Sequence, residues 1–183
     1  ATALPNGTDV TTEDRGVLDL GGYNASIGNL NTSVITGTAF SSAGGFITNS
    51  ATVVKTLTVT PTADSSYGGV IENNVSLVKN GSKKLLFTNQ NTYIGDTTVN
   101  GGVLEVSHVT SGAIDGISGT SSLTVAGGAT FNLLTGTTGG VLTLAPYTGT
   151  ILTLANGSRL GVEVGTFGSS ILRHERIPAA VSE

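Results

Sequence analysis

Residues 67–106 read YGGVIENNVSLVKNGSKKLLFTNQNTYIGDTTVNGGVLEV. Apolar residues at every second position, as in Leu85-Leu86-Phe87 and Leu104-Glu105-Val106, enclose a polar or a second aliphatic residue. This period of two is typical of a β-strand that turns one face to a core. Asn80-Gly81 and Asn100-Gly101-Gly102 separate these runs, and both residue types tolerate the positive φ of a sharp turn. The stretch therefore predicts short strands joined by tight corners.

The same alternation recurs along the chain at a regular distance. Leucines at a nearly constant spacing carry the repeat: Leu85, Leu104, Leu123, Leu142 and Leu160. A second series, Leu133 and Leu152, lies about half a period away. A unit this short cannot bury its own apolar face and must stack on its neighbours. The pattern predicts an all-β parallel β-helix, or solenoid, with rungs of about 19 residues or more, roughly eight or nine of them in a rod about 40 Å long.

A β-sandwich is the alternative fold. Asn-Gly corners also form antiparallel hairpins, and short strands that follow one another at regular intervals occur in sandwiches. The turn residues alone do not separate the two folds. The even spacing favours the solenoid, although the segment 1–75 keeps the period less well.

Composition excludes several classes of function. Only 11% of the 183 residues are charged, the net charge is −4, and there are 27 Gly and no Cys, Met or Trp. Nucleic-acid binding needs a basic patch that an acidic chain with a pI near 5.0 lacks. Without Cys there are no disulfides, thiolate nucleophiles or thiolate metal ligands. No apolar run reaches the length that predicts a transmembrane helix.

Residues that carry chemistry are few and scattered. The chain has two histidines, His108 and His174, and neither has the spacing of a metal-ligand pair. The one acidic group close in sequence is Asp9, Glu13 and Asp14 with Arg15, which we interpret as a solvated N-terminal cap. We expect no catalytic, cofactor-binding or metal-binding residues, no cofactor, and a protein that is not an enzyme.

The alternative function is that of a polysaccharide-active β-helix enzyme of the lyase kind. Such an enzyme needs clustered carboxylates and a cation that stabilises developing negative charge. Asp96 and Glu105 could approach each other across a rung, but surface positions on outward faces are the simpler interpretation.

Residues 67–106 resemble the passenger-associated transport repeat of bacterial autotransporters. Twelve positions match its pattern: Leu77, Lys79, Gly81, Leu85, Asn91, Tyr93, Gly95, Thr97, Val99, Gly102, Leu104 and Val106. The sequence departs from the pattern at Lys83 and Asn89, where the family has Gly, and at Phe87, where it has Leu. The resemblance implies a right-handed parallel β-helix on the outside of a Gram-negative cell.

The matching residues have packing roles in such a coil. Leu85, Phe87, Leu104 and Val106 are expected to point inward. A further three residues are expected at the corners: Asn91 satisfying backbone groups and stacking on asparagines of adjacent rungs, Tyr93 covering the turn, and Gly95, like Gly102, allowing close approach between rungs.

Together these observations predict an extracellular or cell-surface structural or adhesive module, with residues 1–170 as the solenoid and 171–183 as a charged tail, cap or linker. The open strand edges at its two ends could template pairing with another copy, giving a homo-oligomer or a head-to-tail filament. A surface glycan or a protein receptor is the other expected partner.

Overall fold

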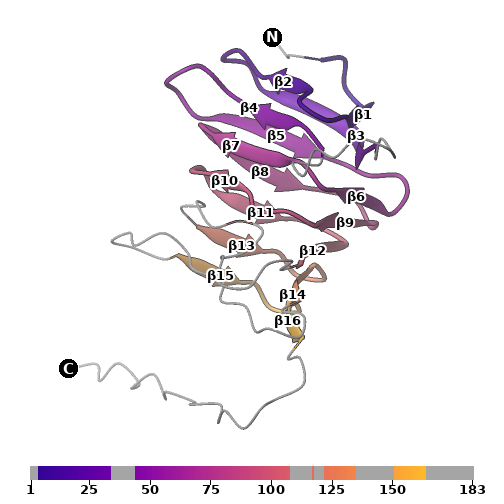
Figure 1. Ribbon diagram of the computed structural model, residues 1–183. Helices are drawn as coiled ribbons and strands as arrows, with labels where there is room; N and C mark the ends of the chain where they lie inside the picture. The colour runs from indigo at the N-terminus through magenta and orange to yellow at the C-terminus, as the bar shows by residue number, and fades with distance from the viewer. Residues whose placement is uncertain (1–3, 34–43, 108–116, 118–121, 135–150, 164–183) are drawn as a thin grey trace, which may run out of the picture.

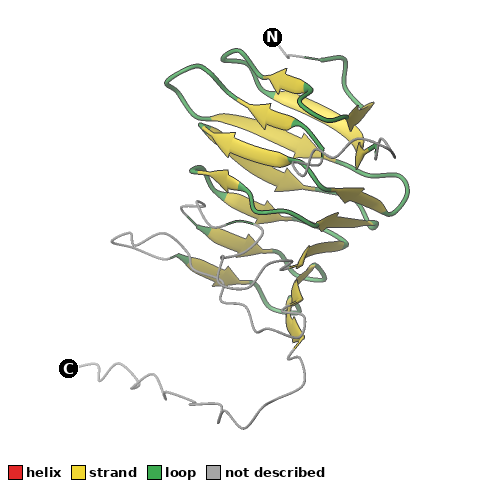
Figure 2. Cartoon of the chain, viewed as in Figure 1, coloured by secondary structure: helices red, strands yellow, loops and turns green. Residues whose placement is uncertain are grey.

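The computed structural model describes residues 4–33, 44–107, 117, 122–134 and 151–163, and this part of the chain consists of strands and turns without a helix (Figure 2). The strands are β1 (Thr8–Thr12), β2 (Val17–Asp19), β3 (Ala25–Thr32), β4 (Phe46–Thr48), β5 (Lys55–Val59), β6 (Ser65–Tyr67), β7 (Val70–Asn73), β8 (Val75–Lys79), β9 (Lys84–Phe87), β10 (Thr92–Tyr93), β11 (Thr97–Val99), β12 (Val103–Ser107), β13 (Leu123–Val125), β14 (Thr130–Leu134), β15 (Leu152–Leu154) and β16 (Arg159–Glu163).

The strands form three parallel sheets. A seven-stranded sheet has the order β1-β3-β5-β8-β11-β13-β15, a five-stranded sheet the order β16-β14-β12-β9-β6, and a four-stranded sheet the order β10-β7-β4-β2. The chain visits the three sheets in turn, as β8, β9 and β10 do, and then returns to the first sheet one step further along (Figure 1). This coil is a parallel β-helix, as predicted. Every described strand pair is parallel, which rules out the antiparallel sandwich.

Rung lengths differ from the even spacing of the leucines. Leu85 does lie beside Leu104, one predicted period along the chain. Leu104, however, pairs with Phe131 in the five-stranded sheet, whereas Leu123 pairs with Thr97 in the seven-stranded sheet. The next period, from Leu104 to Leu123, therefore joins two different faces of the coil. Because the later rungs are longer, the seven-stranded sheet holds fewer rungs than the predicted eight or nine, and spans about 30 Å.

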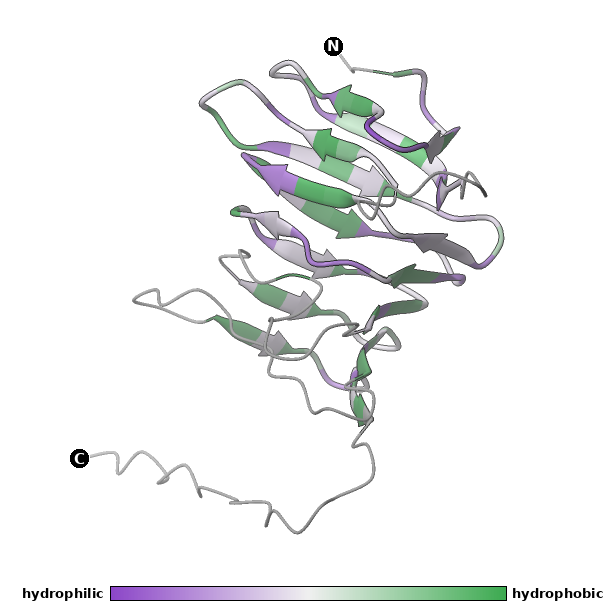
Figure 3. Ribbon diagram, viewed as in Figure 1, coloured by the Kyte–Doolittle hydropathy of each residue, from purple (hydrophilic) through white to green (hydrophobic). Residues whose placement is uncertain are grey.

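The core is a set of inward ladders in which equivalent side chains stack from rung to rung. In the five-stranded sheet Leu85, Leu104 and Phe131 form one ladder, and Phe87 and Val106 belong to the next. All five are completely buried, which confirms the predicted inward residues. Hydrophobic and polar residues alternate along the strands in Figure 3. Burial of one such side chain contributes about 1.5–3 kcal/mol, and the ladders supply the main stabilisation of the coil.

Two glycines permit the spacing of the rungs, as predicted. A Cβ on Gly95 would lie 2.2 Å from Ser76 Oγ and 2.5 Å from the Val75 carbonyl oxygen, so only hydrogen fits there. Gly102 has φ +61°, and its Cβ would lie 2.5 Å from the Lys83 carbonyl oxygen. Both positions lie at corners where adjacent rungs come closest.

The described strands end at Glu163, inside the predicted solenoid of residues 1–170. The predicted tail 171–183 lies outside the described residues, so that boundary stays a prediction. In the described part of the chain, no helix is long and apolar enough to span a membrane.

Candidate functional site

A buried lysine lies inside the coil. Lys79 ends β8 and is fully buried in the inward ladder, between Val59 and Val99 of the neighbouring rungs. Its Nζ donates hydrogen bonds to the carbonyl oxygens of Asn80 (2.7 Å), Gly81 (3.1 Å) and Gly101 (3.1 Å). Burial lowers the pKa of Lys79 to about 8, and Asp64 acts in the opposite direction. The ammonium group thus satisfies corner carbonyls of two successive rungs from the inside.

Asparagines perform the same task at other corners. Asn91 is buried, its Oδ1 accepts the Ile71 N–H at 2.7 Å, and its Nδ2 donates to the Asn89 carbonyl at 3.1 Å. This confirms that Asn91 satisfies corner backbone groups. Asn49 is the more extensive example, because its side chain bonds backbone groups of Gly22, Ala51, Val53 and Asn74. Rungs before and after Asn49 are joined through one amide.

Tyr93 was expected to cover the turn, and this expectation is wrong. Its side chain is fully buried in the core, and its hydroxyl lies 2.7 Å from Thr97 Oγ1. Thr97 is itself buried, so the pair satisfies both polar groups within the interior. Burial raises the pKa of Tyr93 well above its usual value. The reason for the inward position is the alternation of β10, which directs Thr92 outward and Tyr93 inward.

Carboxylates hold the outer corners. Asp9 accepts the Asn29 backbone N–H at 2.7 Å and the Asn29 side-chain amide at 3.0 Å, and these bonds lower the pKa of Asp9. Hydrogen bonds from Ser50 and the Gly21 N–H lower the pKa of Asp19 in the same way. Each carboxylate receives an N–H from the next rung, so its role here is that of an inter-rung clamp.

The predicted acidic group is therefore not one site. Asp9 is bonded to Asn29, while Glu13, Asp14 and Arg15 lie in the corner between β1 and β2. No group of three or more His, Asp or Glu side chains in the described part of the chain could hold a metal ion.

The suggested approach of Asp96 to Glu105 does not occur. Asp96 accepts from Ser122 Oγ at 2.7 Å at the edge of the seven-stranded sheet. Glu105 belongs to the five-stranded sheet and forms an ion pair with Lys84 at 3.0 Å. The two carboxylates have separate partners on separate faces. His108 and His174 lie outside the described residues.

The outward face of the seven-stranded sheet is a regular hydroxyl array. Cross-strand register places one residue of each strand in a single outward column: Ser26, Thr58, Val78, Thr98, Thr124 and Thr153. Neighbours in the column are about 4.8 Å apart, the spacing of strands in a sheet. Such a face is flat, uncharged and rich in hydrogen-bonding groups, and we name it the hydroxyl face.

A parallel β-helix with buried polar corner residues and no grouped catalytic side chains among its described residues is a structural class of fold. Residues 77–106 match the family model of the passenger-associated-transport-repeat, which confirms the resemblance seen in the sequence. The match begins in β8 and ends in β12, so it spans one complete turn of the coil and the start of the next. No curated protein and no solved structure matches the chain.

Sequence reasoning did not assign a role to Lys79 or Asn49. Lysine is almost never fully buried unless its charge has partners, and those partners are corner carbonyls that the sequence does not show. A lysine at an inward position of the alternation, two residues after Leu77, was the available signal.

Proposed function

We propose that this chain is a rod-like segment of an autotransporter passenger, exposed outside the cell, with a structural or adhesive role and no catalytic activity. One observation carries the proposal. The residues that match the passenger repeat are those that build a complete rung, from Leu77 through the Lys79 corner to Val106. The matching residues serve packing and corner closure, and the family is a structural repeat.

The architecture supports a passenger role on physical grounds. Each rung contacts only its neighbours, so the coil can form progressively from one end. Folding energy released outside the membrane then favours onward movement of the chain. The Lys79 and Asn49 corners make each added rung hydrogen-bonded to the one before it.

Adhesion would use the hydroxyl face. Its evenly spaced hydroxyls suit a partner that also repeats along one direction, such as a surface glycan, whose ring hydroxyls donate and accept hydrogen bonds. Aromatic platforms for sugars are scarce, because only 5% of the residues are aromatic and there is no Trp. A binding mode based on many weak hydroxyl contacts follows from this composition.

The export proposal is tested by placing the chain between a signal peptide and an outer-membrane translocator in a Gram-negative host. We expect the wild-type chain at the cell surface, accessible to antibody and resistant to external protease. The matched control is Gly95→Val, which blocks one rung contact and is expected to stall or to become protease-sensitive. A wild-type chain that stays inside the cell, although the translocator alone inserts, would contradict the proposal.

The lyase alternative has a simple assay. Incubation with acidic polysaccharides would give unsaturated products that absorb in the ultraviolet. We expect no increase in absorbance, and a steady increase would replace the structural proposal by the enzymatic one.

A further inference from the structure

The last described rung exposes the core of the coil. Its inward residues continue the buried ladders: Leu152 lies beside Leu123, Leu154 beside Val125, and Leu160 beside Phe131. Leu123, Val125 and Phe131 are fully buried, yet Leu152, Leu154 and Leu160 are 39%, 45% and 45% exposed. Val162 is also exposed. These four aliphatic side chains, which we name the terminal cluster, lie at one end of the coil.

The backbone at this end also has a free edge. The Leu123 N–H donates to the Ile151 carbonyl, and the Ala155 N–H donates to the Val125 carbonyl. Residues 151 and 155 therefore direct their backbone groups to β13. Because successive residues of a strand alternate, Leu152 and Leu154 direct theirs to the opposite edge, where the order of described strands ends. An edge of this kind accepts a further parallel strand.

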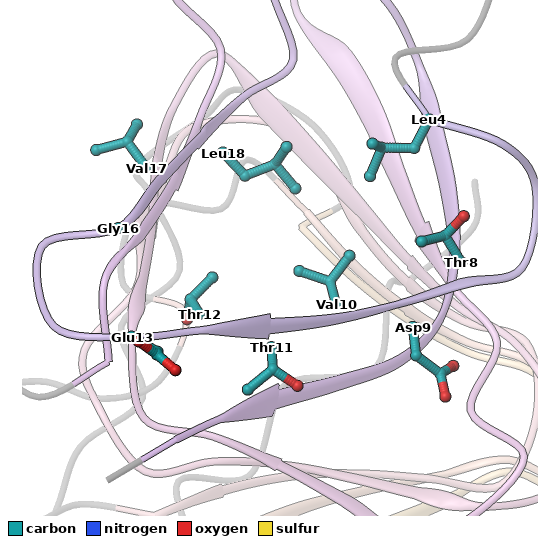
Figure 4. Close-up of a pocket in the computed structure, with 10 residues that line it drawn as sticks. All are labelled: Leu4, Thr8, Asp9, Val10, Thr11, Thr12, Glu13, Gly16, Val17 and Leu18. Carbon is teal, nitrogen blue, oxygen red and sulfur yellow. The ribbon is translucent and has the colours of Figure 1, made fainter. Parts of the chain in front are cut away.

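The opposite end of the coil has the complementary form. Between the first strands and the N-terminal segment is a hollow of about 460 Å³. Leu4, Val10 and Leu18 line it and are only partly buried against the core (Figure 4). Val10 and Thr12 point from β1 into this hollow, while Asp9 and Thr11 point away from it (Figure 4). β1 is the other terminal strand of the seven-stranded sheet.

Charges at the two ends are opposite. The β1 end carries exposed carboxylates at Asp9 and Glu13 and, in the same corner, Asp14 and Arg15, so its net charge is negative. The terminal cluster lies beside Arg159, which is exposed at the start of β16. Glu13 follows β1 and Arg159 follows the corner after β15. In a stack of two coils, these opposite charges would meet at the same corner.

We propose that a second copy of this chain covers the terminal cluster, with its β1 paired in parallel to β15 and its hollow over Leu152 and Leu154. The inward parity of both strands is then kept, which places Thr153 beside Thr11. The contact is heterologous, so each copy leaves one free β1 end and one free β15 end, and the assembly grows as an open filament. This inference rests on the proposed structural role and names its partner as another copy.

Cysteine trapping tests the polarity of the contact, because the chain has no Cys of its own. The test uses three variants, Thr11→Cys, Thr153→Cys and the double variant, each oxidised at several protein concentrations. Paired residues of adjacent parallel strands lie about 4.8 Å apart, which is within disulfide range. We expect the double variant to form a ladder of dimers, trimers and longer species, and an equimolar mixture of the two single variants to form dimers. Each single variant alone stays monomeric. Efficient dimers from Thr153→Cys alone would show the wrong polarity and would overturn the proposal.

Sedimentation of the unmodified chain gives an independent test. We expect the weight-average mass to rise continuously with concentration, without a plateau at the dimer. Leu154→Glu places a charge in the terminal cluster and is expected to abolish the rise, whereas Thr153→Glu, on the outward side of the same strand, is expected to reduce it much less. Circular dichroism shows whether each variant stays folded.

A charge exchange distinguishes this contact from other causes of association. Arg159→Glu is expected to weaken association at low salt, and the added substitution Glu13→Arg is expected to restore it. A wild-type chain that is monomeric at every concentration would overturn the proposal, whether residues 164–183 or another protein covers the terminal cluster. Surface display of the chain would still succeed in that case, so failure of this inference and failure of the passenger role give different results.

Discussion

Lys79 closes a corner of the coil with a charge that water does not reach. Its ammonium group replaces solvent for three carbonyl oxygens, at the cost of its own desolvation. The consequence is a pH-dependent stability. Burial moves the pKa from 10.5 to about 8, so between these values the unfolded chain binds a proton that the folded chain has released. Stability from this residue therefore increases as the pH rises through that window.

Lys79→Met removes this titration. We expect the difference in unfolding free energy, wild type minus variant, to increase from pH 7.5 to pH 10, by up to about 3 kcal/mol for the full shift. Urea unfolding at four pH values measures it. The buried tyrosines Tyr67 and Tyr93 are present in both proteins, so their own loss of stability at high pH cancels in the difference. A difference that does not change with pH would show that Lys79 keeps an ordinary pKa.

Gly95 determines how close two rungs can lie. A methyl group there would overlap Ser76 and the Val75 carbonyl, and the rungs would have to separate. We expect Gly95→Ala to lower the unfolding free energy by about 1–3 kcal/mol, as for other overpacked sites. Gly128→Asn is the control, because Gly128 has open space around it and asparagine tolerates its φ of +80°. Equal losses in the two variants, measured by thermal unfolding, would contradict the close-approach role.

Corners are the elements that give the coil its cohesion. The strands supply apolar ladders, but at the corners the backbone groups leave the sheet and need other partners. Asn49, with a 1% exposed side chain, satisfies four of them across neighbouring rungs. The exposed pair Asn80 and Asn100 forms only one side-chain bond, at 2.9 Å, and water can replace it.

Substitution of these asparagines separates buried from exposed corners. We expect Asn49→Ala to cost about 2–4 kcal/mol, because several buried backbone groups lose their partners. Asn100→Ala is expected to cost less than about 1 kcal/mol. Chemical denaturation with parallel fluorescence and circular dichroism measures both. A comparable cost at the two positions would mean that burial of Asn49 does not matter.

Acid acts on the outer corners. The pKa values of Asp9 and Asp19 are lowered in the folded chain, so their contribution is present above the unfolded values and is lost as the pH falls through the folded ones. We expect stability to decrease below about pH 4 and the decrease to be smaller in an Asp9→Asn, Asp19→Asn variant. Thermal unfolding between pH 2 and pH 6 tests this. An identical profile for the variant would exclude these clamps as the cause.

At the scale of the whole molecule, the sequence predicted the coil because its signals are local. Alternation identifies the inward residues, such as Leu85 and Leu104, and paired Asn and Gly identify the corners. Rung length was not predictable from the same signals. Leucines on two different sheets, Leu104 and Leu123, happen to repeat the spacing of Leu85 and Leu104, and only the pairing of strands distinguishes a face from its neighbour.

The candidate site was less predictable than the fold. The inward tyrosine Tyr93 follows from the parity of β10, a strand too short to be recognised in the sequence. Burial of Lys79 depends on carbonyls of two rungs that meet only after the coil closes. The hydroxyl face requires the register of every strand. Each of these features belongs to the contact between rungs, for which a single rung of sequence carries no direct signal.

The pairing of rungs in register is the claim on which the function depends, and disulfide trapping within one molecule tests it directly. Val78 and Thr98 are partners in adjacent outward strands, whereas Val78 and Thr124 are separated by a whole strand. We predict that a Val78→Cys, Thr98→Cys variant oxidises to a monomeric disulfide and that a Val78→Cys, Thr124→Cys variant does not. Oxidation of the second variant but not the first would contradict the coil described here.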